Sequence, residues 1–334
     1  MTAIARVQPT AQMMADAQQI VHTIAQSFAT KVVGQEELRE SLMIGLLAGG
    51  HVLLESVPGL AKTTAARVLA ESVRGSFQRI QCTPDLLPSD IIGTQIYEAA
   101  TNSFATQLGP VHANIVLLDE INRSSAKTQS AMLEAMEERQ TTIAGKLYPI
   151  PDPFLVIATQ NPVDQEGTYP LSEAQTDRFM LKEVLRYPTA AEEVEVLFRI
   201  DAGVYDKGNP TRPVVSLEDI RRLQAITAGV HMDPSLMHYV SQIVSVTRSP
   251  AQLLPPQIAR YVQYGASPRA TIAFSRAARA LALLSGRNHV VPQDIKHLAY
   301  RVLRHRLILG FEATAAGVTP ENVVDAVMAT VRIP

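Results

Sequence analysis

The sequence contains no tryptophan and a single cysteine, and its 334 residues carry a formal net charge of only −2 at pH 7. One cysteine, Cys82, excludes an intrachain disulfide bond, and we expect its side chain to be a small residue of the core. A net charge this small produces no strong field that would draw the chain to nucleic acid. Aromatic residues make up 5% of the chain, so few side chains are available to stack on single-stranded bases.

Long apolar segments are also lacking. The longest stretch, residues 44–54, is broken by glycines and by His51, and it is too short to cross a bilayer. The N-terminus has no basic start followed by a sustained apolar run, so no secretory signal peptide is predicted. We therefore expect no membrane insertion and a cytoplasmic location.

Short apolar runs alternate with helical patterns in the first part of the chain. The five runs cover residues 51–55, 77–81, 115–119, 154–159 and 180–186. Runs that are apolar throughout are typical of strands buried on both faces of a parallel sheet. The helical spacing of apolar residues between them, as in 127–138, indicates an α/β fold with helices on both sides of the sheet.

The pattern changes after Pro188, beyond which helical spacing dominates and almost no strand is indicated. The expected helices cover residues 192–200, 217–228, 234–247, 268–284, 292–306 and 320–331. We therefore expect two domains, an α/β core formed by residues 1–187 and an α-helical domain formed by residues 188–334.

A candidate phosphate-binding loop follows the first predicted strand. Residues 56–63 read Ser-Val-Pro-Gly-Leu-Ala-Lys-Thr, whereas the general pattern is G-x-x-x-x-G-K-[ST], so Ser56 and Ala61 replace its two glycines. Gly59 allows backbone angles that turn N–H groups toward an anion. Lys62 supplies a positive charge for the phosphates of ATP, and Thr63 a hydroxyl for Mg²⁺. Alanine is tolerable at position 61 if that residue has a negative φ. The alternative is an ordinary turn between a strand and a helix.

A second motif lies at the end of the third predicted strand, where Asp119 and Glu120 follow an apolar run. Asp119 can hold Mg²⁺, and Glu120 can orient or deprotonate the attacking water. Two acids at a strand end are common in ordinary loops, but their position one strand beyond Lys62 makes the pair specific. Together the two motifs predict a magnesium-dependent ATPase.

Three further polar residues fit a nucleotide site. Asn161 follows the fourth strand and could hold the attacking water; it could also be a turn residue before proline. Arg178 precedes the last strand and could reach the γ-phosphate of a neighbouring subunit, or form a surface ion pair with Asp177 or Glu173. Arg269 begins a helix of the second domain and could contact the phosphates of its own subunit, or be solvated.

Several longer strings of the sequence are distinctive. These strings are Val33-Gly-Gln-Glu-Glu37, Leu53-Leu-Glu-Ser-Val-Pro-Gly-Leu-Ala-Lys-Thr63, Arg79-Ile-Gln-Cys-Thr-Pro-Asp-Leu-Leu-Pro-Ser-Asp90, Leu118-Asp-Glu-Ile-Asn-Arg123, Leu133-Glu-Ala-Met-Glu-Glu-Arg139, Asn161-Pro-Val-Asp-Gln-Glu-Gly-Thr-Tyr-Pro-Leu171 and Gly265-Ala-Ser-Pro-Arg269. Together they resemble the MoxR family of AAA+ ATPases, in the group with a helix-2 insert. The resemblance extends from Lys31 to Leu309 and implies an AAA+ phosphate-loop core with a five-stranded parallel sheet, followed by an all-α lid.

The resemblance also implies roles for individual residues. Lys62 and Thr63 are the Walker A residues, and Asp119 and Glu120 are the Walker B pair, with Glu120 as the catalytic residue. Asn161 is sensor 1, Arg178 is the arginine finger and Arg269 is sensor 2. Thr63 and Asp119 are the implied magnesium ligands. The implied ATP-binding residues are Val33, Gly34, Ser56, Val57, Pro58, Gly59, Leu60, Ala61, Lys62, Thr63 and Thr64, of which the first two border the adenine.

Members of this family are similar to chaperones that assemble or activate protein complexes, or that assist metal-cofactor insertion. The resemblance therefore implies a hexameric ring of identical subunits and a protein partner with a von Willebrand factor A domain. Two predicted hairpins, at residues 94–106 and 141–148, resemble the helix-2 insert and the pre-sensor hairpin of the group. They could instead be surface hairpins without a partner.

Two other functions remain open. A DNA-associated or magnesium-chelatase-type motor is suggested by basic residues late in the chain, which we expect instead to form a solvated face of the lid helices. These residues are Arg276, Arg279, Arg287, Arg301, Arg304, His305 and Arg306. A passive nucleotide-binding scaffold is suggested by Ser56, since the family usually has glycine at that position.

Overall fold

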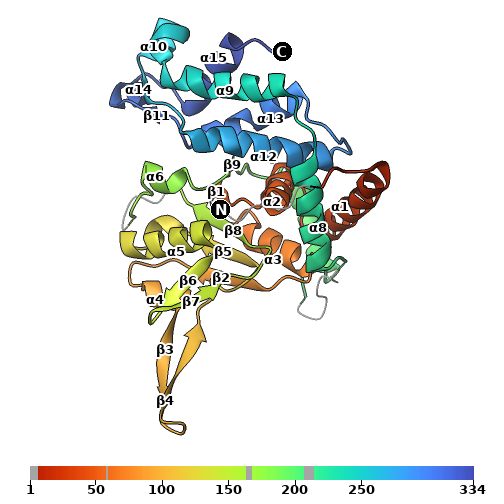
Figure 1. Ribbon diagram of the computed structural model, residues 1–334, viewed down its shortest axis with the longest axis vertical. Helices are drawn as coiled ribbons and strands as arrows, with labels where there is room; N and C mark the ends of the chain where they lie inside the picture. Colours follow the sequence, from red (N-terminus) through yellow and green to blue (C-terminus); the bar gives the residue numbers. More distant parts are fainter. Residues whose placement is uncertain (1–6, 58, 163–167, 207–213) are drawn as a thin grey trace. The chain divides into compact units, whose positions relative to one another are not determined.

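The structure is a computed structural model that describes residues 7–57, 59–162, 168–206 and 214–334 (Figure 1). Its contacts divide the chain into two compact units. The first, the α/β unit, contains Gln19–Leu171 and Glu183–Leu223. The second, the helical unit, contains Ser172–Lys182, Gln224–Pro334 and residues 7–18.

The α/β unit is built on a five-stranded parallel sheet with the strand order β2-β5-β8-β1-β9. The strands are β1 (Val52–Glu55), β2 (Phe77–Gln81), β5 (Ile115–Asp119), β8 (Leu155–Gln160) and β9 (Leu181–Val184). All five strands coincide with the apolar runs, so the predicted fold class is confirmed. Because the strands are parallel, the loops that leave β1, β5 and β8 all emerge at the same edge of the sheet.

Helices alternate with these strands along the chain. The helices between the N-terminus and β9 are α1 (Ala11–Lys31), α2 (Glu36–Ala48), α3 (Lys62–Ser72), α4 (Pro88–Ile92), α5 (Ala126–Glu138) and α6 (Glu173–Thr176). After β9 come α7 (Ala190–Asp201) and α8 (Leu217–Gly229). Helix α2 is buried at every position from Ser41 to Ala48, which makes it the helix most enclosed by its neighbours.

Two antiparallel hairpins interrupt the α/β pattern, as predicted. β3 (Gly93–Glu98) pairs with β4 (Ser103–Leu108) through six residue pairs, and the ribbon extends away from the sheet in Figure 1. β6 (Gln140–Ile143) pairs with β7 (Lys146–Pro149). Exposed Tyr97 and Phe104 pack edge to face on the first hairpin, with ring centroids 5.5 Å apart.

The helical unit is a bundle around α12. Its helices are α9 (Pro234–Arg248), α10 (Pro250–Leu253), α11 (Pro256–Ala259), α12 (Pro268–Leu284), α13 (Pro292–Leu303), α14 (Phe311–Ala315) and α15 (Pro320–Thr330). Helix α12 contacts both α9 and α13, and its buried face consists largely of alanine, which lets neighbouring backbones approach closely. A short antiparallel pair, β10 (Val262–Tyr264) with β11 (Ile308–Leu309), is the strand structure found among the described residues of this unit.

The basic residues late in the chain do not form the solvated face that we expected. Arg301 and Arg306 are buried. Arg279 donates to the Val230 carbonyl, and Arg287 forms a bidentate ion pair with Asp294. Groups within the unit therefore satisfy the guanidinium groups of Arg279 and Arg287, so these two residues give no support to nucleic-acid binding.

Candidate nucleotide-binding site

The loop between β1 and α3 begins beside β8. The backbone N–H of Ser56 donates to the Gln160 carbonyl at 3.0 Å, and the buried Ser56 hydroxyl donates to the carbonyl of Val57. Serine therefore fits at this position without an unsatisfied hydroxyl. Pro58, predicted as part of the loop, lies outside the described residues.

Two positive φ angles shape the rest of this loop. Gly59 has φ 90°, and no described atom lies within 4 Å of the point that a Cβ would occupy. Ala61 has φ 53° and ψ 19°, so the condition under which we expected alanine to be tolerated here, a negative φ, is not met. A left-handed conformation at a residue with a Cβ carries a steric cost, which the glycine of the general pattern avoids. The loop therefore keeps the backbone path of that pattern despite the substitution.

Helix α3 starts at Lys62, directly after this turn. Its first turn, which the structure describes in full, contains no acidic residue and includes Thr63 and Thr64, both partly buried. The first N–H groups of a helix have no partner within the helix, and they carry the positive end of its dipole. Together with the ammonium group of Lys62, they present an anion-binding end at the edge of the sheet where the strands terminate.

The charge on Lys62 lies close to the predicted acid pair. Burial lowers the pKa of the Lys62 ammonium, and the negative charges of Asp119 and Glu120 partly counteract that shift. The tertiary structure thus places the lysine after β1 near the two acids after β5, although β8 lies between these strands. This juxtaposition is what the two motifs predicted.

Asp119 ends β5 and has a partner on each carboxylate oxygen. Its Oδ1 accepts a hydrogen bond from the Thr159 hydroxyl at 2.8 Å, and its Oδ2 accepts from Nη2 and Nε of Arg79 at 2.6 and 3.1 Å. Arg79 lies on β2, which pairs directly with β5. The carboxylate is thus held from both sides by neighbouring strands.

Glu120 has an unusual backbone conformation for a residue with a side chain, with φ 58°. Its N–H donates to the Thr159 hydroxyl at 2.8 Å, and its Oε2 accepts from Gln81 at 3.1 Å and lies 3.3 Å from Nε of Arg123. Strained backbone held by surrounding hydrogen bonds is frequent at functional sites.

Three contributors to this arrangement were missed by sequence reasoning: Arg79, Gln81 and Thr159. Arg79 and Gln81 alternate with Ile80 on β2, so their side chains share one face of the strand. Two polar residues at that spacing near the end of a strand were the feature of the sequence that could have indicated their role in the site. The neighbour of Gln81, Cys82, is buried as predicted, and burial raises the pKa of its thiol to about 12.

The remaining predicted residues of the α/β unit lie around the same loops. Asn161 is buried and directly follows β8. Val33 and Gly34 precede α2, and Gly34 has φ 60°. A Cβ at Gly34 would lie 2.1 Å from Oε1 of Glu192, a residue in the first turn of α7. The segment at 33–34 therefore packs against the start of α7, and a Cβ at position 34 would require the Glu192 side chain to move.

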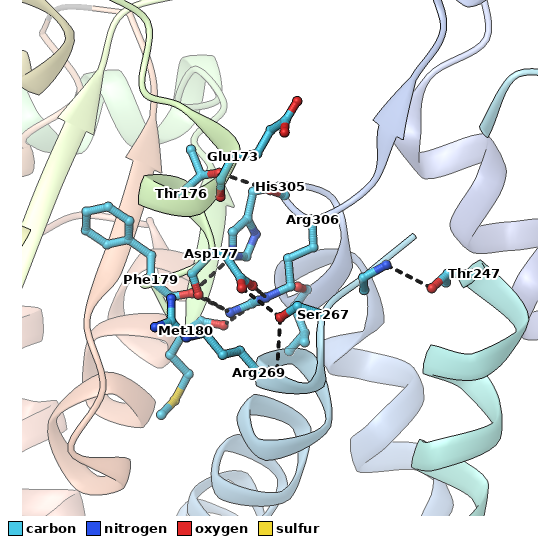
Figure 2. Close-up of polar contacts among 12 residues, drawn as sticks. Glu173, Thr176, Asp177, Phe179, Met180, Thr247, Ser267, Arg269, His305 and Arg306 are labelled. Carbon is cyan, nitrogen blue, oxygen red and sulfur yellow. Dashed lines mark hydrogen bonds and ion pairs between the residues drawn. The ribbon is translucent and has the colours of Figure 1, made fainter. Parts of the chain in front are cut away.

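Arg178 and Arg269 belong to the helical unit. Arg178 lies between α6 and β9, and Arg269 is exposed in the first turn of α12. The neighbouring Asp177 forms a 2.7 Å ion pair with Arg306, whose side chain is buried. Figure 2 shows Arg269 near the Asp177–Arg306 pair.

Comparisons with known proteins agree with this geometry. Residues 51–181 match the family described as "ATPase family associated with various cellular activities (AAA)", and residues 257–327 match the AAA lid domain. The fold and the loop arrangement therefore define an AAA module with its helical lid.

The comparisons also give the family. The chain is 48% identical to Chaperone MoxR1 of Mycobacterium tuberculosis, over 94% of this chain and 83% of that protein. It is 31% identical to Protein MoxR of Methylorubrum extorquens, over 98% and 99% of the two chains. The chain belongs to the MoxR family of AAA ATPases, which confirms the resemblance seen in the sequence.

A solved structure supports the same assignment. The crystal structure of a Cytophaga hutchinsonii protein, proposed to be an ATPase, superposes with a TM-score of 0.90 at 43% identity and covers 96% of this chain and 97% of that one. In the part of the chain that the structure describes, no helix combines the length and low polarity needed to cross a membrane.

Proposed function

We propose that the protein binds and hydrolyses ATP with Mg²⁺ and uses the cycle to remodel other proteins. The observation that carries the proposal is the convergence of Lys62, Asp119 and Glu120 at the edge of the sheet where α3 begins. A cation at a helix N-terminus next to two carboxylates suits a phosphate chain with a divalent metal, because each charged group then has an oppositely charged neighbour.

The loop and the first turn of α3 fit the phosphates of ATP. The open space at Gly59 and the N–H groups of α3 would hold the phosphate oxygens, and Lys62 would pair with the β- and γ-phosphates. The segment at 33–34 would border the adenine through its backbone. These contacts are made to the phosphates by main-chain groups and one cation, so they do not distinguish one nucleoside triphosphate from another.

The residues also fit a magnesium ion. Among the described residues, no cluster of three or more histidines, cysteines and acids could hold a metal by itself. Mg²⁺ in nucleotide sites is usually held by one or two protein oxygens together with phosphate oxygens and water. Thr63 and Asp119 would supply those oxygens. A bound Mg²⁺ neutralises charge that develops on the phosphates.

Hydrolysis needs a group that acts on water. Glu120 is suited to this role because its backbone is held by Thr159 and its carboxylate is directed by Gln81. We assign it as the general base that accepts a proton from the attacking water, with Asn161 assisting from the end of β8. Arg178 and Arg269 would stabilise the charge on the γ-phosphate, Arg178 from a neighbouring subunit.

The remodelling role comes from the relatives. One of them is named a chaperone, and AAA modules commonly work as rings. We propose a homohexamer whose client or partner is a protein, with a von Willebrand factor A domain as the candidate partner, and a cytoplasmic location. We also propose that residues 188–334 form the domain that transmits the nucleotide state. The exposed β3–β4 hairpin is a candidate point of contact with a client.

Two substitutions test the ATPase proposal. Lys62→Ala should abolish tight ATP binding, because the helix N-terminus alone replaces little of the lost charge. Glu120→Gln should bind ATP with near wild-type affinity and lose turnover by roughly 10²-fold or more, since it keeps the shape but removes the base. Binding is measured with a fluorescent ATP analogue and turnover by phosphate release. Wild-type affinity in Lys62→Ala, or wild-type turnover in Glu120→Gln, would place the site elsewhere.

A further inference from the structure

Arg306 is a buried charged residue of the helical unit whose guanidinium group is fully hydrogen-bonded. It follows α13, and its side chain is only 2% exposed. Its guanidinium has five N–H bonds, and each has an acceptor. Nε donates to Asp177 Oδ1 at 2.7 Å, Nη1 donates to the carbonyls of Met180 and Val302, and Nη2 donates to the carbonyls of Asp177 and Phe179 at 3.1 and 2.7 Å. Four of these five acceptors belong to residues 177–180, so Arg306 clamps that short segment (Figure 2).

The same carboxylate is tied to a second element. The other oxygen of Asp177, Oδ2, accepts a 2.7 Å hydrogen bond from the Ser267 hydroxyl. Ser267 is the N-cap of α12, where its side-chain oxygen accepts from the N–H of Arg269 at 3.1 Å. Asp177 therefore connects the segment that contains Arg178 to the helix turn that contains Arg269.

Neighbouring groups support the clamp without adding charge. His305 lies against the Phe179 carbonyl, with Nε2 at 3.1 Å, and its own carbonyl accepts from the Thr176 hydroxyl. Burial, together with the positive charge of Arg306, holds the pKa of His305 well below its usual value, so this ring is neutral at physiological pH. The ion pair at the clamp is consequently formed by Arg306 and Asp177, without a contribution from His305.

We propose that Arg306 is a positioning residue that holds Arg178 and Arg269 in one fixed arrangement, acting through Asp177 and Ser267. The inference rests on the proposed function, in which both arginines act on nucleotide phosphates. Arg178 follows Asp177 directly, and Arg269 lies two residues after Ser267. A shift of either anchor therefore moves an arginine, and a displacement of about 1 Å can reduce a reaction rate by about 10²-fold.

The main test is Arg306→Lys. Lysine keeps the charge but offers three N–H bonds from one nitrogen, so it cannot reproduce the planar fork that reaches four acceptors in one segment. We expect kcat to fall by about 10- to 100-fold, with the affinity for a fluorescent ATP analogue within about threefold of wild type, because the phosphate loop lies in the other unit. The matched control is Arg287→Lys, which alters a bidentate ion pair with Asp294 in the same unit and should leave kcat unchanged.

A milder pair of variants covers the case in which Arg306→Lys does not fold. Ser267→Ala removes the hydroxyl that joins Asp177 to α12, and Thr319→Ala removes a comparable N-cap from α15. The two should lower thermal stability by similar amounts. Only Ser267→Ala should reduce kcat, and equal kcat values in the two variants would refute the coupling.

A double-mutant comparison separates this inference from the proposed function. If Arg306 acts through Arg178 and Arg269, then Arg306→Lys should cause no further loss of kcat in a variant in which both arginines are alanine. An equal further loss in that background would refute the positioning role. Normal turnover in Arg306→Lys, with turnover lost in Arg178→Ala, would overturn only the inference. Normal turnover in Arg178→Ala and Arg269→Ala would overturn the roles of the arginines and the inference together.

Discussion

Arg79 and a magnesium ion would compete for the carboxylate of Asp119, and this competition can be measured. In the structure, both Nη2 and Nε of Arg79 bond to one oxygen of Asp119. The metal proposed for this site needs the same carboxylate. We therefore predict that Arg79→Gln lowers the Mg²⁺ concentration required for half-maximal binding of a non-hydrolysable ATP analogue.

The size of the effect follows from the exposure of the pair. The Arg79 side chain is 46% exposed and that of Asp119 is 11% exposed. Exposed ion pairs contribute about 0.2–1 kcal/mol, and hydrogen bonds to charged groups about 1.5–3 kcal/mol. Because water screens the exposed Arg79 side chain, the lower of these two ranges applies, and we take about 1 kcal/mol as the free energy of the Arg79–Asp119 interaction. That free energy corresponds to about a fivefold decrease in the Mg²⁺ midpoint.

The assay is a Mg²⁺ titration followed by the fluorescence anisotropy of the labelled analogue. Arg221→Gln is the matched control, because it also removes a half-exposed arginine that pairs with an acid. That acid, Asp152, precedes the first residue of β8, so it lies at the end of the strand away from the proposed site. The control should bind with the wild-type midpoint. A midpoint that stays constant or rises in Arg79→Gln would show that Arg79 does not oppose the metal, and that the ion pair instead prepares Asp119 for it.

Three other predictions address the ring, the loop and the core. Arg178→Ala should bind ATP normally but lose turnover. Mixing it with Lys62→Ala should restore part of the ATPase activity, because a subunit that keeps Lys62 receives Arg178 from its neighbour. Mixed rings without restored activity would contradict action between subunits. Ala61→Gly should raise the free energy of unfolding by about 0.5–1 kcal/mol, because relieving a steric cost of about 1–2 kcal/mol at φ 53° outweighs the added entropy of the unfolded chain. A lower free energy of unfolding in the variant, measured by urea denaturation, would show that Ala61 is not strained. Burial lowers the pKa of His51 to about 3, so below pH 6.5 the unfolded chain binds a proton that the folded chain does not. The free energy of unfolding should therefore fall by about 1.4 kcal/mol per pH unit between pH 6 and 4. This contribution to the pH dependence of stability should be absent in His51→Gln.

The local structure of this protein could be predicted well from the sequence because it depends on neighbouring residues. The limits of β2, β5 and α12 agree with the apolar runs and the helical spacing. The phosphate loop and the acid pair are each contiguous in the chain, so their chemistry can be recognised from residue types alone. The long strings shared with the MoxR family gave the fold class for the same reason.

The contacts that orient the site depend on how distant segments meet. Arg79 reaches Asp119 across 40 residues and Arg306 reaches Asp177 across 129, and no periodicity in the sequence indicates either pair. The sign of φ at Ala61 also depends on the surrounding loop, since the intrinsic preference of alanine is for negative φ. Arg306, which we expected in solvent, is buried because a carboxylate and carbonyls from other elements satisfy its guanidinium group. The sequence by itself determined which elements form and which residue types carry the chemistry, and only the tertiary structure decided which charges face one another, because pairing in a folded chain depends on the path of the backbone between the partners.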